Sequence, residues 1–292
     1  MVPVQLNWLG KWHCKTQEYF AMERQISIQL YSVRAQLAAD YEGTLRAIAG
    51  MGFTNVEPAG FPGYSPEKAV KLFADLGLRA PSCHSALPIG DNRNQVVETA
   101  LMLGHSMIIT GCPPKFRESF KDADAIKATA ELYCAAAEVA AVHGLQVGYH
   151  NHDWDLQRVG DDYGYRLFLE NTPETVLWEA DLYWVARAGL SPVEFVKEIG
   201  ARGRILHFKD GVIHVDDEFV EAETGDGKIM VSNSVPFLPA GTGMVDLRGA
   251  ADAAVHAEYA VVELDSYAGD MMKAVRQSYN YLVGSGIAKG RK

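Results

Sequence analysis

The chain has 292 residues, of which 48% are hydrophobic and 22% charged, and its formal net charge at pH 7 is −10. This balance is typical of a folded globular protein, while the acidic excess argues against a nucleic-acid backbone or an anionic membrane as the main partner. No apolar stretch approaches the roughly 18 residues of a membrane span. The four cysteines are widely spaced, so we expect a cytoplasmic protein with reduced thiols.

The first 24 residues differ in character from the rest of the chain. They include Trp8, Trp12 and Tyr19 among polar residues and lack the apolar core of a signal peptide. We therefore expect an N-terminal extension over residues 1–24 and one domain over residues 25–292. The length alone would allow two domains, but α/β barrels of this size fold as one.

From Ile26 onward, short apolar runs alternate with amphipathic stretches of helical period. Ser65 before Pro66 is typical of a helix start, and Gly52 of a helix end. The strands expected in the first half cover residues 26–31, 54–57, 78–84 and 106–110. The expected helices cover residues 41–51, a stretch from 66, 95–103, 123–143, 163–170, 192–199 and 270–283.

Four later strand-like runs each stop on ionisable residues. They end in the segments Tyr149-His150-Asn151-His152, Trp178-Glu179-Ala180-Asp181, His207-Phe208-Lys209-Asp210 and Val262-Glu263-Leu264-Asp265. Buried parallel strands read as near-continuous apolar runs, and an ionisable group at the end of such a run is costly unless it is paired or bound to metal. Four such endings in succession indicate one convergent polar site.

Eight strand–helix units in strict alternation predict a parallel sheet. Eight units in about 260 residues favour closure into a single (β/α)8 TIM barrel of the α/β class. The alternative, an open doubly wound sheet, would need a Gly-rich phosphate turn after the first strand, where the chain has Tyr31-Ser32-Val33-Arg34. In a barrel the active site lies at the C-terminal ends of the strands, where the polar endings fall.

The polar endings predict a metal site. Side chains two apart on a strand share a face, and we expect His150, Asp181, His207 and Glu263 to bind one divalent ion. Two imidazoles and two carboxylates suit a transition ion, and we expect Mn²⁺, with Co²⁺, Zn²⁺ or Mg²⁺ as alternatives. The competing interpretation is a buried ion-pair network without metal.

Three residues near this site are candidates for catalysis besides Glu263. His150 could be the general base instead of a ligand, or a core histidine. His152 is expected just beyond the ion, in contact with substrate. Lys209 could hold a substrate oxygen or neutralise an enolate, or it could form a salt bridge to Glu179 or Asp210.

Four further residues are candidates for substrate binding. Glu57 and His84 end the second and third strands and would face the same mouth, where each could bind a sugar hydroxyl or orient a metal ligand. Trp184 follows a ligand strand, and its aromatic face suits the C–H face of a sugar. Asp155 could reach the substrate from a loop. Core packing and solvated loop positions are the structural alternatives.

The connection over residues 211–244 is unusually long and acidic. Long loops in compact domains are usually functional. Because this one follows an expected ligand strand, it could be a lid or a subunit contact, and a variable surface excursion is the alternative.

The order and spacing of these motifs resemble the sugar phosphate isomerase/epimerase superfamily, the xylose-isomerase-like barrels, over about residues 26–283. The segments that carry the resemblance are Gln29-Leu30-Tyr31-Ser32-Val33-Arg34, Val56-Glu57-Pro58-Ala59-Gly60, Tyr149-His150-Asn151-His152, Asp181-Leu182-Tyr183-Trp184, His207-Phe208-Lys209-Asp210 and Gly241-Thr242-Gly243. The resemblance implies Asp181, His207 and Glu263 as metal ligands. It departs at the fifth strand, where His150 replaces the usual Glu, one of two acid/base carboxylates in the epimerases. This variant looks more like the inosose-dehydratase and keto-glycoside-processing branches.

The residues and the resemblance together predict a divalent-metal-dependent isomerase or epimerase of a keto-sugar or related carbohydrate. Removal of the proton α to a carbonyl would give an enediolate, and reprotonation elsewhere would complete the isomerisation. Expulsion of a β-substituent would instead make the enzyme a lyase, either an inosose dehydratase or a keto-glycoside-cleaving enzyme. We expect a small carbohydrate as substrate and a homo-oligomer as the assembly, with a hetero-assembly as the alternative.

Two other classes compete with this prediction. A DNA-repair endonuclease of the related barrel type would need a basic groove, which the net charge of −10 opposes. A non-catalytic sugar-binding barrel or assembly subunit would keep sugar affinity without metal.

Overall fold

The computed structural model describes residues 23–213, 219–224, 227–232 and 237–291. Except for its last two residues, the expected extension over residues 1–24 lies outside the described residues, so the division at residue 24 stays a prediction. Within the described part, no helix is both long enough and apolar enough to cross a membrane.

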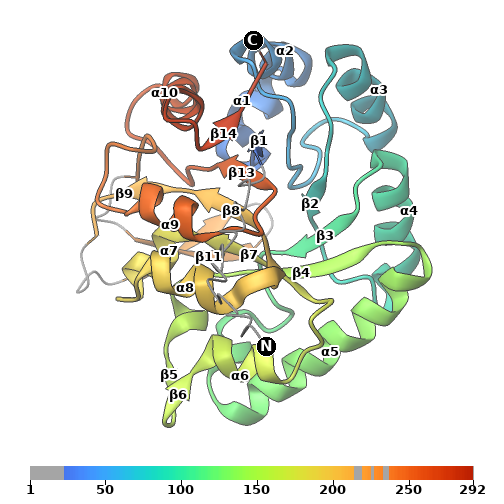
Figure 1. The fold of residues 1–292 in the computed structure, drawn as a ribbon. Coiled ribbons are helices and arrows are strands. Elements are labelled where there is room, and N and C mark those ends of the chain that lie inside the picture. Colours follow the sequence, from blue (N-terminus) through green and yellow to red (C-terminus); the bar gives the residue numbers. More distant parts are fainter. Residues whose placement is uncertain (1–22, 214–218, 225–226, 233–236, 292) are drawn as a thin grey trace, which may run out of the picture.

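Strands and helices alternate along the chain (Figure 1). The strands of the main sheet are β1 (Arg24–Ile28), β2 (Ser82–His84), β3 (Met107–Thr110), β4 (Gln146–His150), β7 (Leu177–Asp181), β8 (Gly203–Phe208), β13 (Tyr259–Val262) and β14 (Ala288–Lys289). The helices are α1 (Arg34–Ala39), α2 (Tyr41–Met51), α3 (Pro66–Leu76), α4 (Arg93–Leu103), α5 (Ala123–Val142), α6 (Gly164–Glu170), α7 (Leu182–Arg187), α8 (Pro192–Ile199), α9 (Leu247–Ala253) and α10 (Met271–Gly284).

The main sheet is parallel, in the order β14-β1-β13-β8-β7-β4-β3-β2. Residues 54–57 fill the gap between β1 and β2, because Glu57 N donates to Ile28 O at 2.8 Å and Val56 N to Arg79 O at 2.8 Å. With this segment the sheet closes on itself, which confirms the predicted single (β/α)8 barrel. β14 is an extra strand alongside the start of β1.

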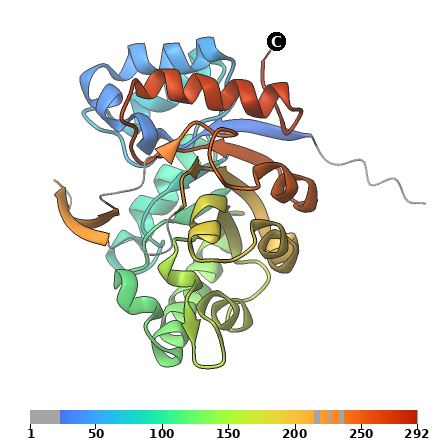
Figure 2. The ribbon, with the colours of Figure 1, turned by 90° about the vertical axis from the view of Figure 1, so that its left-hand side faces the viewer.

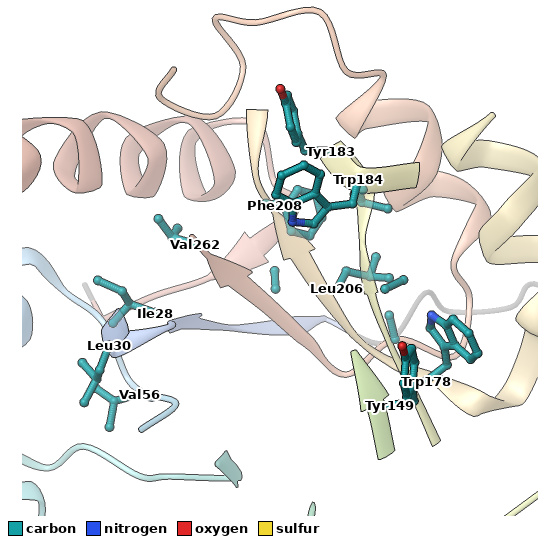
Figure 3. Packing of buried hydrophobic residues seen from close by; sticks show 14 of the residues in the cluster. Ile28, Leu30, Val56, Tyr149, Trp178, Tyr183, Trp184, Leu206, Phe208 and Val262 are labelled. Atoms are coloured by element: carbon teal, nitrogen blue, oxygen red, sulfur yellow. The ribbon is translucent and has the colours of Figure 1, made fainter. Parts of the chain in front are cut away.

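Alternation along the strands separates two cores. Ile205 and Val261 point into the barrel with Met107, Ile109 and Leu177. Their neighbours Leu206 and Val262 point outward and pack beneath the helices, as Figure 3 shows for the outer core. Because His207 shares the inward face with Ile205, the same alternation directs its imidazole to the barrel axis.

The helix boundaries follow the capping signals in the sequence. Ser65 accepts a hydrogen bond from Lys68 N at the start of α3, and Pro66 is the first helical residue. α2 ends at Gly52, whose φ of 105° belongs to the left-handed region that glycine adopts without strain. The short helices α1, α7 and α9 were not predicted, because six or seven residues make fewer than two full turns and the apolar pattern hardly repeats.

The long connection after β8 contains strands that its sequence did not predict. β9 (Asp210–Gly211) pairs with β12 (Phe237–Leu238), and β10 (Phe219–Thr224) forms an antiparallel hairpin with β11 (Gly227–Ser232). Figure 2 shows the hairpin projecting away from the barrel. A role for the connection as a lid or a subunit contact stays a prediction.

Asp210 fastens the end of this connection to β8. Its buried carboxylate accepts hydrogen bonds from the backbone N–H groups of Gly211 (2.9 Å), Gly241 (3.0 Å), Gly243 (2.9 Å) and Val245 (3.1 Å). Gly243 approaches so closely that an added Cβ would lie 2.2 Å from Asp210 Oδ1. The segment Gly241-Thr242-Gly243 is therefore a structural clamp around Asp210.

Substitution of Asp210 should destabilise the fold strongly. In Asp210→Ala the N–H groups lose their acceptor. We expect the free energy of unfolding to fall by at least about 2 kcal/mol, because Gly211 N and Val245 N are buried and each buried unpaired donor costs about 1–3 kcal/mol. Asp252→Ala, which removes an exposed ion pair on α9, is the matched control and should cost less than about 1 kcal/mol. Denaturant unfolding of both variants checks this, and equal losses would contradict the clamp.

His105, between α4 and β3, should make stability depend on pH. Its side chain is buried, and burial lowers the pKa from 6.5 to about 4. Below about pH 6.5 the unfolded chain binds a proton that the folded chain resists, so stability falls as the pH drops from 6.5 toward 4.

Because of His105, we expect the free energy of unfolding to be about 2 kcal/mol lower at pH 5 than at pH 7.5. His105→Leu should lose less stability over this interval than the unmodified chain. Denaturant titrations at the two pH values provide the comparison. If His105→Leu and the unmodified chain lost the same free energy of unfolding between the two pH values, burial of His105 would have no such effect.

Candidate active site

The polar strand endings meet at one mouth of the barrel. Residues from six strand ends contribute, and the side chains within contact of one another are Glu57, His84, His150, Glu179, Asp181, His207 and Glu263. All except His84 are buried, and His84 is partly exposed. The sequence-predicted residues Glu57 and His84 thus lie beside the predicted ligands.

Three imidazoles surround one carboxylate oxygen. Glu179 Oε2 lies 2.6 Å from His84 Nε2, 2.9 Å from His150 Nδ1 and 3.1 Å from His207 Nε2. We call His84, His150, Glu179 and His207 the three-histidine set. Their donor atoms all lie within 4.8 Å of one another.

Glu57 joins this arrangement from the neighbouring strand. Its Oε2 atom lies 2.8 Å from His207 Nε2 and accepts a hydrogen bond from Gln29 Nε2 at 2.9 Å. Gln29 Oε1 in turn accepts from Tyr31 N at 3.0 Å, which fixes the amide. Gln29, at the end of the first strand, therefore holds Glu57 in place.

Lys209 lies among a second group of carboxylates. Its Nζ atom is 2.8 Å from Asp181 Oδ2, 2.9 Å from Glu263 Oε2 and 3.1 Å from Asp265 Oδ1. The salt bridge considered from the sequence therefore exists, but with these partners instead of Glu179 or Asp210. Burial alone would lower the pKa of Lys209, and the surrounding carboxylates raise it well above its ordinary value.

Asp181 has two structural contacts. Its Oδ1 atom accepts hydrogen bonds from Tyr183 N at 3.0 Å and Trp184 N at 3.1 Å, which caps α7, while Oδ2 faces Lys209. Burial raises the pKa of Asp181 to about 7, although Lys209 opposes that shift.

The electrostatics of the three-histidine set follow from burial and mutual pairing. Burial lowers the pKa of His150 to about 4, so its imidazole is neutral at pH 7. Burial also raises the pKa of Glu57, with Glu179 adding to the shift. The histidines around Glu179 overcome burial and hold the pKa of this carboxyl well below its usual range.

The loop after β4 places His152 at the edge of the site. The His152 ring lies 5.1 Å from the His150 ring and stacks on Trp154 at 4.1 Å between centroids. Asp155 Oδ2 accepts a hydrogen bond from His152 N at 2.7 Å, and burial raises the pKa of this fully buried carboxyl to about 8. Asp155 supports the loop backbone, and its contact with substrate stays a prediction.

Aromatic side chains line the side of the site near Lys209. Lys209 Nζ lies 5.3 Å from the ring centroid of Trp184 and 5.7 Å from that of Phe237 in β12. Trp184 also packs 6.0 Å from Phe237 and 5.7 Å from His152. Trp184 is itself buried, and its contact with a sugar stays a prediction.

The sequence placed Glu179 and Asp265 among the polar strand endings, on the same strand faces as expected ligands, but gave neither a role as ligand or catalyst. It did not place Gln29 in the site. Gln29 gave no ionisable signal, and only the register of Gln29 with Glu57 reveals its role.

The residues of the mouth have the chemistry of a divalent-metal site. The predicted ligand set of His150, Asp181, His207 and Glu263 has all its donor atoms within 4.8 Å of one another, as the three-histidine set also has. Lys209 contacts the carboxylates of Asp181, Glu263 and Asp265. Glu57 and Glu179 contact imidazoles instead, so a divalent ion among these imidazoles would offset their negative charge. Both sets contain His150 and His207.

Comparisons with known proteins place the fold but not the reaction. A sugar phosphate isomerase/epimerase from Parabacteroides distasonis ATCC 8503 has a TM-score of 0.69 with 23% identity, over 91% of this chain and 96% of that one. The probable 3-DHS dehydratase AsbF from Bacillus anthracis has a TM-score of 0.66 with 15% identity, over 89% and 98%. An AP endonuclease, family 2, from Brucella melitensis has a TM-score of 0.60 with 14% identity, over 90% and 99%.

No protein-family model and no curated protein sequence matches this chain. The fold is that of the sugar phosphate isomerase/epimerase and xylose-isomerase-like barrels, as the sequence motifs predicted. Because similar structures with this fold carry three different activity names, the fold alone does not identify the reaction, and the reaction has to be argued from the residues of the site.

His207 provides a direct test of metal binding, because it belongs to both donor sets. We expect His207→Ala to bind Mn²⁺ or Zn²⁺ at least about 100-fold more weakly than the unmodified chain, since loss of a ligand should exceed the 10–100-fold cost of losing a partner of a ligand. His152→Ala, which removes a neighbouring imidazole outside both sets, should retain its metal. Elemental analysis after dialysis measures both, and full metal content in His207→Ala would refute the assignment.

Proposed function

We propose that this protein is a divalent-metal-dependent isomerase or epimerase of a keto-sugar or a related carbohydrate. The observation that carries the proposal is the convergence of three imidazoles, five carboxylates and one lysine at the C-terminal mouth of the barrel. The isomerase/epimerase name of a similar structure agrees with it. Sugar-binding without catalysis is the competing proposal.

Two overlapping donor sets could hold the ion, and both contain His150 and His207. Asp181 and Glu263 complete the first set, and His84 and Glu179 complete the second. When bound, the ion would act as a Lewis acid toward the substrate carbonyl. Mn²⁺ is the proposed ion, as the mixture of imidazole and carboxylate donors would allow.

Residues of the chain would accept the substrate proton and stabilise the negative charge that forms on the substrate. His150 is neutral at pH 7 and could accept the proton α to the carbonyl, if it is not a ligand, and Glu263 is the second candidate. Lys209 carries a positive charge against the aromatic wall and would stabilise negative charge that develops on a substrate oxygen. Glu57, His84, His152 and Trp184 would position the sugar.

A lyase reaction is the second candidate on the same site. His150 stands at the fifth strand, where the epimerases that the sequence resembles have a catalytic Glu, and a dehydratase is among the similar structures. Elimination shares the first proton abstraction with isomerisation, so these residues would keep their roles. The endonuclease name of another similar structure finds less support, because the net charge of −10 opposes binding to a phosphate backbone.

Exchange of the substrate proton with solvent tests the proposal. In heavy water containing Mn²⁺, we expect deuterium to enter the position α to the carbonyl of at least one member of a panel of keto-sugars, keto-glycosides and inososes. Removal of the ion by a chelator should abolish the exchange. Mass spectrometry of the recovered sugar measures it, and conversion of a substrate without any deuterium incorporation would argue against proton abstraction.

Lys209→Met separates catalysis from binding in the same assay. We expect it to slow exchange by about 10²-fold while weakening substrate binding less, because its charge would act on the developing enolate. Lys197→Met, at an exposed ion pair on α8, is the matched control and should exchange normally. Sugar binding by the unmodified chain without any exchange would favour the non-catalytic class.

A further inference from the structure

We infer that the divalent ion of the proposed function binds to the three-histidine set, His84, His150, His207 and Glu179, and that Lys209 serves as the resident cation for Asp181 and Glu263. This inference rests on the proposed function and refines it, since the ligands predicted from the sequence were His150, Asp181, His207 and Glu263. His150 and His207 belong to both sets, whereas His84 and Glu179 replace Asp181 and Glu263.

The first argument is the convergence of donors on one point. Three ring nitrogens lie 2.6, 2.9 and 3.1 Å from Glu179 Oε2, so small shifts would place all four donors around one ion. Three imidazoles and one carboxylate form a donor set that suits Zn²⁺ and other transition ions.

The second argument is that a cation already neutralises the other carboxylates. Lys209 Nζ contacts both Asp181 Oδ2 and Glu263 Oε2 within 2.9 Å. An ion bound to those same oxygen atoms would bring two positive charges together in a buried site, which is costly. Glu179 and Glu57 pair instead with imidazoles and with the amide of Gln29.

The third argument comes from buried oxygen atoms without a partner. Glu57 Oε1 and Glu179 Oε1 belong to fully buried side chains, and neither has a hydrogen-bond partner among the described residues. A buried carboxylate oxygen left unpaired is costly. A metal ion next to Glu179 would give these two carboxylates the positive charge that Lys209 gives to Asp181 and Glu263.

The second nitrogen of each shared histidine fits this arrangement. With His207 Nε2 toward the ion, His207 Nδ1 can donate to Glu263 Oε2 at 2.8 Å. With His150 Nδ1 toward the ion, His150 Nε2 faces Asp181. Histidine ligands in metal sites commonly donate their other N–H to a carboxylate. Asp181 and Glu263 would then orient ligands without being ligands themselves.

X-ray absorption of the protein loaded with one equivalent of Zn²⁺ tests the inference, because it counts imidazole ligands directly. We expect three imidazoles in the unmodified chain and two in His84→Ala. His152→Ala is the matched control, because it removes an imidazole outside the set and should leave the count at three. If the unmodified chain and His84→Ala both showed two imidazole ligands, the inference would be overturned, and the proposed function would be unaffected.

Zinc affinities provide an independent measurement if His84→Ala folds poorly. Glu179→Gln should weaken Zn²⁺ binding by more than about 100-fold, whereas Asp181→Asn, as a partner of a ligand, should weaken it by about 10–100-fold. Competition with a coloured chelator gives both values. The opposite order would overturn the inference, and a complete lack of Zn²⁺ and Mn²⁺ binding by the unmodified chain would sink the proposed function itself.

Discussion

The pairing of Lys209 with the buried carboxylates of Asp181 and Glu263 and the partly exposed one of Asp265 is the interaction on which the mouth of the barrel depends. Without its ammonium, the two buried carboxylates would face each other uncompensated, and breaking a buried pair of this kind typically costs about 3–5 kcal/mol. Asp181 also caps α7 and so fixes the position of Trp184. Charge balance and the shape of the aromatic wall are therefore coupled through one carboxylate.

The barrel makes this concentration of charge possible, because it separates apolar and polar requirements along each strand. On β8, Ile205 fills the barrel interior, His207 lies one step closer to the mouth, and Leu206 and Phe208 pack under the helices (Figure 3). The apolar layers below and outside the site provide the stability. The residues at the strand ends can therefore be polar or charged without loss of the apolar packing that stabilises the barrel.

Much of the fold could be predicted because local signals agreed with the final structure. The bounds of α2 and α8 match the expected residues 41–51 and 192–199, since caps and periodicity mark both ends. The site was harder to predict, because a single sequence shows which residues share a face but not which atoms meet across strands. Glu179 was expected only as a possible partner of Lys209, and the structure shows it in contact with three histidines instead. Asp210 binds backbone N–H groups instead of Lys209.

The fastening at Asp210 has a consequence for how this site could change in evolution. The β9–β12 pair and the carboxylate of Asp210 hold both ends of the connection between Gly211 and Phe237 at fixed positions beside Lys209. The entropic cost of closing a loop grows only slowly with its length, so residues inserted or deleted between these anchors would leave the strand ends in register. The length of this connection could therefore vary while the charged mouth stays unchanged.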